Sequence, residues 1–91
     1  MALAVYFHPD SVSAKQYDDI VKKLEAAGLG NPKGRTHHSA FGPNERMMVY
    51  EVWDSQADFE AFGAGLMPIL AAAGIDPGQP DVMPVHNTIQ P

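Results

Sequence analysis

Residues 46–53 and the residues that follow them constrain the fold more than any other part of the chain. The run from 47 to 53 is rich in β-branched and aromatic side chains and is interrupted only by Glu51, which predicts a largely buried strand. Ser55 can then accept a hydrogen bond from the amide of Asp58, and the apolar spacing changes to that of a helix. Because a carboxylate in a buried strand needs a partner or a polar cavity, Glu51 is the first candidate functional residue.

The rest of the chain supplies further strands and one more helix. Ser13 and Gln16 have the spacing of a capping box, so a helix is expected to begin at about Ala14. The second helix contains Pro68 and two glycines, which predicts a kink or a break near residues 65–67. The expected strands are residues 3–8, 35–41, 46–53 and 82–89, and the expected helices are residues 14–27 and 55–73.

The chain also repeats itself loosely. Residues 24–29, Leu-Glu-Ala-Ala-Gly-Leu, return as Leu-Ala-Ala-Ala-Gly-Ile at 70–75, and each copy closes a helix before a proline-containing loop and a strand. Two βαβ halves joined by a hairpin predict one ferredoxin-like α+β domain over residues 1–91. Its four-stranded antiparallel sheet would have the order 4-1-3-2, with both helices on one face.

Composition limits the classes of partner. The net charge of −5 argues against nucleic acid, whose phosphates require a basic surface. The chain has no cysteine, so it has no disulfide and no thiolate nucleophile. The uncharged span 61–75 is too short and too broken for a transmembrane helix. Without a recognisable signal peptide, a cytoplasmic protein with no membrane association is expected.

The order of elements, together with residues 50–55 leading to Phe59 and Phe62, resembles the dimeric α/β-barrel superfamily of ferredoxin-like folds. That group includes antibiotic-biosynthesis-monooxygenase-like and stress-responsive barrel proteins. The resemblance implies a homodimer and covers activities from cofactor-free oxygenation and haem degradation to isomerisation and decarboxylation, as well as members of no known activity. No catalytic set carries over, and the Asn, Trp and His pattern of the haem-degrading members is not found at matching strand positions.

Strand alternation places the candidate site residues. A hairpin loop of residues 42–45 would set His38 opposite Val49, so that His38, Glu51 and Trp53 share a face. The opposite face, with Met48, Tyr50 and Val52, is assigned to the helices. A loop one residue longer or shorter would exchange His38 for His37. The predicted catalytic residues are Glu51, His38 and His86, and the predicted ligand-binding residues are Tyr6, Trp53 and Val49.

Two functions fit these residues. One is a small enzyme, including a cofactor-independent monooxygenase-like enzyme, that acts on a hydrophobic or aromatic small molecule with Glu51 as proton acceptor. The other is a non-catalytic small-molecule-binding or structural dimer. No cofactor is expected, and no metal site either, because adjacent strand residues such as His37 and His38 point to opposite faces. The homodimer would form through the sheet face away from the helices, which is predicted to carry Tyr6, Val49, Trp53 and Val82.

Overall fold

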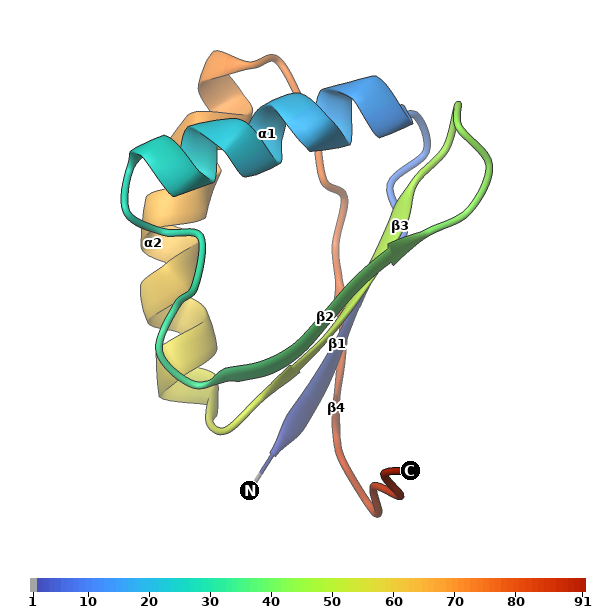
Figure 1. Ribbon diagram of the computed structural model, residues 1–91, viewed down its shortest axis with the longest axis vertical. Helices are drawn as coiled ribbons and strands as arrows, with labels where there is room; N and C mark the ends of the chain where they lie inside the picture. The colour runs from blue at the N-terminus through green and yellow to red at the C-terminus, as the bar shows by residue number, and fades with distance from the viewer. Residues whose placement is uncertain (1) are drawn as a thin grey trace.

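The computed structural model describes residues 2–91 and has the element order βαββαβ (Figure 1). Ser13 begins the first helix with a capping box, in which its hydroxyl accepts from the Gln16 amide and the Gln16 side chain accepts from the Ser13 amide. Ser55 caps the second helix by accepting from the amide of Asp58. The elements are β1 (Leu3–Phe7), α1 (Ala14–Ala26), β2 (Arg35–Phe41), β3 (Met48–Trp53), α2 (Gln56–Ala72) and β4 (Asp81–Pro84).

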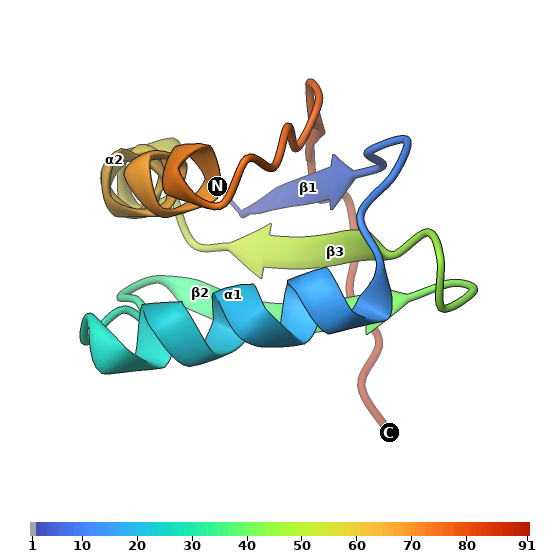
Figure 2. The same cartoon turned by 90° about the horizontal axis from the view of Figure 1, so that it is seen from above.

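The four strands form one antiparallel sheet in the order β2-β3-β1-β4, which is the predicted order read from the opposite edge. Both helices lie on the same side of this sheet (Figure 1). Figure 2, seen from above, shows β1, β3 and β2 side by side with alternating directions. The ferredoxin-like α+β fold predicted from the sequence is therefore confirmed.

The prediction of which sheet face meets the helices was wrong. Val5 and Trp53 are fully buried, and the ring of Trp53 packs on Phe59 and Phe62 of α2 with centroids 5.7 and 5.3 Å apart. The strand face that carries Glu51 and Trp53 is therefore the helix-facing side. The alternate residues, among them Tyr50, lie on the outer face. The buried apolar core consists of Val5, Ile20, Leu24, Trp53, Phe62 and Leu70.

The β2–β3 hairpin has a longer loop than expected. β3 begins at Met48 rather than at residue 46, because the amide of Met47 donates to the carbonyl of Val12 instead of to the neighbouring strand. As a result His38 lies opposite Glu51, two residues from the predicted register. A shift of two preserves strand alternation, so His38, Glu51 and Trp53 still share a face.

The last two elements also differ from expectation. α2 runs from Gln56 to Ala72 as one helix, so no break occurs at Pro68. β4 ends at Pro84, which cannot donate to a ladder, rather than at residue 89. Within residues 2–91, neither helix combines the length and the apolar character needed to cross a membrane.

Candidate functional site

A β-bulge in β2 brings two basic side chains to the same side of the sheet. Arg35 lies opposite Trp53 and His37 opposite Val52, so Thr36 is an extra residue in the ladder. An extra residue inverts the alternation that follows it. Arg35 and His38, three positions apart, therefore both face the helices, and both reach Glu51.

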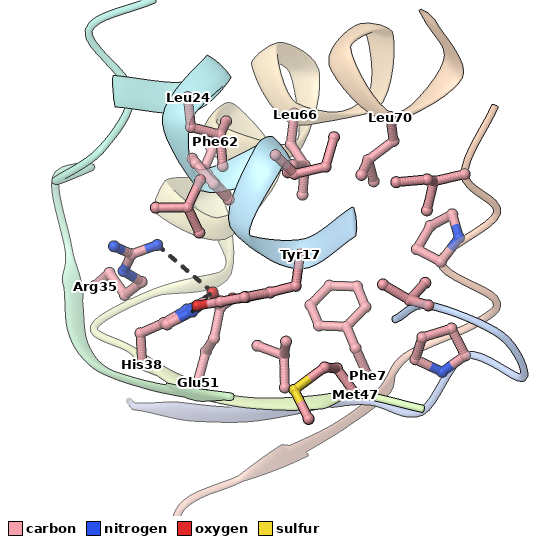
Figure 3. A pocket seen from close by; sticks show the side chains of 17 residues that line it. Phe7, Tyr17, Leu24, Arg35, His38, Met47, Glu51, Phe62, Leu66 and Leu70 are labelled. Atoms are coloured by element: carbon pink, nitrogen blue, oxygen red, sulfur yellow. Dashed lines mark hydrogen bonds and ion pairs between the residues drawn. The ribbon is translucent and has the colours of Figure 1, made fainter. Parts of the chain in front are cut away.

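Glu51 is the centre of a buried polar cluster. It is only 3% exposed, and its Oε1 accepts from the indole Nε1–H of Trp53 at 3.1 Å. Its Oε2 lies 2.6 Å from Nδ1 of His38 and 3.6 Å from Nη1 of Arg35. The Nε2 of His38 in turn lies 2.6 Å from the hydroxyl of Tyr17 on α1. Tyr17 from α1, Arg35 and His38 from β2, and Glu51 from β3 meet between the helices and the sheet (Figure 3).

The carboxylate sets the direction of these hydrogen bonds. An ionised Glu51 can only accept, so Nδ1–H of His38 donates to it and Nε2 is left as an acceptor for the Tyr17 hydroxyl. Burial raises the pKa of Tyr17 above its usual value of 10.0; the nearby charges of Glu51 and Asp18 act in the same direction, and Arg35 opposes them. Tyr17 therefore holds its proton at neutral pH and donates it in a hydrogen bond to His38.

Arg35 is held in place by two further contacts of its guanidinium group. Its Nη2 donates to the carbonyl of Gly30 at 3.0 Å, and its Cζ lies 5.7 Å from the ring centre of Phe62. The positive charge of Arg35 is paired with the negative charge of Glu51, and both side chains are largely removed from water. The pair leaves the cluster close to electrically neutral.

A mostly apolar cavity of about 100 Å³ opens beside this cluster. Its polar residues, Tyr17, Arg35, His38 and Glu51, lie together at one side in Figure 3. A cavity of ~150 Å³ lined by apolar side chains binds benzene in an engineered protein, so this smaller space suits no more than about one ring of a ligand. The apolar lining comes from Phe7, Pro9, Val12, Ile20, Val21, Leu24, Met47, Val49, Phe62, Leu66, Leu70, Ile75 and Pro77.

The structure brings some of the predicted site residues together and separates others. Glu51 and His38 are in contact, Trp53 donates to Glu51, and Val49 lines the cavity. This group faces the helices, whereas the sequence predicted that it would lie on the face away from them. The ambiguity between His37 and His38 is resolved geometrically, since His37 lies on the outer face and bonds to Ser39.

Tyr6 and His86 do not belong to this cluster. Tyr6 lies on the outer face, where its hydroxyl donates to the sulfur of Met48 at 3.2 Å. His86 is exposed and follows the end of β4. Their predicted places beside Glu51 were wrong because the first came from assigning the Glu51 face to the outer side and the second from extending the last strand past Pro84.

Sequence reasoning missed Tyr17 and Arg35. In the sequence Tyr17 lies at helical spacing with the apolar residues of α1, and a tyrosine hydroxyl needs a partner once that face is buried. Arg35 stands at the start of β2 after Gly34, and only the bulge turns it inward. Within residues 2–91, no three His, Asp or Glu side chains are grouped as ligands for a metal ion.

Comparisons with known proteins identify shared architecture. SnoaB, a cofactor-independent oxygenase from Streptomyces nogalater, superposes with a TM-score of 0.69 at 15% identity, over 97% of this chain and 96% of that one. A putative antibiotic biosynthesis monooxygenase from Chloroflexus aurantiacus gives 0.64 at 12% identity, over 97% of both chains. A MhuD mutant with two manganese protoporphyrin IX molecules bound per active site gives 0.55 at 20% identity, over the whole of both chains.

At these identities the likeness establishes the fold alone. It agrees with the ferredoxin-like fold expected from the sequence. No protein-family model matches the sequence, and no curated protein matches it either.

Proposed function

We propose that the protein binds a small apolar or aromatic molecule in the cavity and removes a proton from it through Tyr17, His38 and Glu51. The observation that carries this proposal is the hydrogen-bonded series of these three side chains at the wall of an otherwise apolar cavity. Convergent polar groups in an apolar pocket are the usual arrangement of a small-molecule site.

The geometry supports a proton relay. The Tyr17 oxygen has lone pairs free to accept a proton from the ligand while its own proton passes to Nε2 of His38. The imidazolium that results lies 2.6 Å from the Glu51 carboxylate, which stabilises its charge. The ligand is left as an anion, and the proton it lost is balanced by the one His38 gained. A positioned base of this kind contributes roughly 10²–10⁴-fold to a rate.

Cofactor-independent oxygenation is a reaction that this relay could serve. A carbanion or enolate that is sufficiently electron-rich reduces dioxygen directly, and the protein then has only to remove the proton and exclude water. The shared fold with SnoaB, described as a cofactor-independent oxygenase, supports this choice of reaction class. Dioxygen would be the co-reactant.

A second candidate function is ligand binding without catalysis. It is favoured by the completeness of the cluster, because every buried side-chain nitrogen and oxygen among residues 2–91 already has a hydrogen-bond partner. A fully satisfied polar network also serves to fix the geometry of a core.

The Kemp elimination of 5-nitrobenzisoxazole distinguishes the two functions, since this small aromatic carbon acid reacts in one step with a positioned base. We expect the protein to accelerate the reaction above buffer, and His38→Ala and Glu51→Gln to abolish most of that acceleration. His37→Ala, next in sequence but on the outer face, is the matched control. Saturable binding without acceleration would favour the binding function, whereas unchanged rates in both site variants would refute the relay.

We also propose that the protein is a homodimer joined through the outer face of the sheet. This face carries large apolar side chains in water, including Phe41 at 43%, Tyr50 at 37% and Met83 at 63% exposure. Both helices lie on the other side of the sheet, so neither of them covers this face (Figure 1). A second copy presents the same surface and can bury it.

A further inference from the structure

A second hollow shares part of its lining with the main cavity. It measures about 80 Å³ and is lined by Tyr17, Val21, Leu24, Leu29, Gly30, Arg35 and His38. All but Leu29 and Gly30 also line the main cavity. The two spaces are therefore neighbours, separated by the side chains that they share.

Tyr17 is the side chain best placed to act as the partition. Its ring reaches from α1 toward the sheet (Figure 3) and is fixed at its tip by the 2.6 Å hydrogen bond to His38. The two rings lie nearly parallel, with centroids 6.0 Å apart. Of the other shared residues, Val21 and Leu24 are shorter, and Arg35 is held by Gly30 and Phe62.

We propose that the second hollow is a subsite of the ligand pocket, that it takes a second apolar group of the ligand, and that Tyr17 sets the size limit between the two spaces. The ligand class is a fused two-ring compound or a single ring with a short alkyl arm. Val21, Leu24 and Leu29 supply the apolar contacts for that second group. The inference rests on the proposed function in that the first ring must occupy the main cavity.

Phenol and 2-naphthol form a matched pair for the test, because they share one hydroxyl and differ by one ring. Methyl NMR of the wild-type protein reports both spaces, since Val12 lines only the main cavity and Leu29 only the second hollow. We expect the Val12 methyl signals to shift with both compounds and the Leu29 methyl signals to shift with 2-naphthol alone. Leu29 signals that stay fixed while Val12 signals shift with both compounds would refute the subsite and leave the main pocket standing. Val12 signals that respond to neither compound would contradict the proposed function as well.

Two substitutions test the partition itself. Tyr17→Ala widens the opening between the two spaces, so the ratio of 2-naphthol to phenol affinity should rise by about tenfold, the lower range for added apolar contact in a pocket. Adding Leu29→Phe to this variant fills the second hollow and should return the ratio toward its wild-type value. A ratio that does not change with Tyr17→Ala in a folded protein, as judged by its NMR spectrum, would refute the role of Tyr17. Should that variant not fold, the wild-type NMR comparison still decides the subsite.

Discussion

Burial of the Glu51 carboxylate is unfavourable by itself and is stabilised by side chains that are distant in the sequence. Its carboxylate is removed from water, and that cost is offset by Trp53 two residues away and by His38 and Arg35 from β2. The sequence identified Glu51 as a buried carboxylate and grouped it correctly with His38 and Trp53. It could not identify Tyr17 or Arg35, because their approach depends on helix placement and on a bulge.

Glu51→Gln tests the energetic role of this residue. The amide NH₂ would face Nδ1–H of His38, so one donor is left unpaired or the histidine must change tautomer. We expect a loss of about 1–3 kcal/mol in the free energy of unfolding, measured by urea denaturation. Glu60→Gln, at an exposed position on α2, is the matched control and should change stability by less than about 0.5 kcal/mol. Equal effects of the two substitutions would contradict a stabilising role for the hydrogen-bonded Glu51 carboxylate.

Tyr17 gives stability a dependence on alkaline pH. Above pH 10.0 a tyrosine in the unfolded chain ionises, whereas the raised pKa keeps Tyr17 protonated in the folded state. The folded state then binds more protons than the unfolded state, so stability falls as pH rises from 10.0 through the folded pKa. Tyr17→Phe should remove this part of the slope in urea unfolding series, while Tyr50→Phe should keep it. Identical slopes for wild type and Tyr17→Phe would argue against burial as the cause.

At the scale of elements, alternation within strands was predictable and the choice of face was not. β3 has apolar residues on both faces, since Met48, Tyr50 and Val52 oppose Val49 and Trp53. Hydrophobicity alone therefore did not decide which face met the helices, and the charge of Glu51 favoured the wrong one. The cap residues Ser13 and Ser55 were predicted correctly because capping depends on nearby backbone amides.

Gly34 forms the turn that immediately precedes the bulged strand β2. It has φ of +87°, and a Cβ at this position would clash with the carboxylate of Asp58. We expect Gly34→Ala to destabilise the protein by more than about 1 kcal/mol in thermal or urea unfolding. Gly63→Ala, inside α2 with no atom near the added methyl, should instead stabilise by roughly 0.5–1 kcal/mol. A Gly34→Ala variant as stable as Gly63→Ala would show that the turn adapts.

At the scale of the whole molecule, the order of the elements was enough to predict the fold. The site depends instead on contacts between elements that are distant in the sequence. The two βαβ halves and the hairpin were enough to give the sheet order β2-β3-β1-β4. The cavity, by contrast, is lined by both helices, by β1, β2 and β3, and by the loops after β1, β2 and α2, and no local pattern encodes its shape.

The proposed dimer gives a prediction at the same scale. Tyr50→Glu places a charge at the centre of the outer sheet face, and we expect it to halve the mass measured by light scattering at micromolar concentration. Ala26→Glu, on the exposed side of α1, adds the same charge away from that face and should leave the mass unchanged. A wild-type protein that is folded and monomeric across dilution would refute the dimer.

The hydrogen bond from Trp53 to Glu51 has a spectroscopic consequence. The chain has one tryptophan, so all indole emission comes from a ring whose N–H points at the carboxylate of the candidate site. Indole emission is sensitive to charge beside the ring, and neutralising or displacing Glu51 should change its wavelength and intensity. The protein therefore contains its own fluorophore for following events at Glu51, without a label and before any substrate is known.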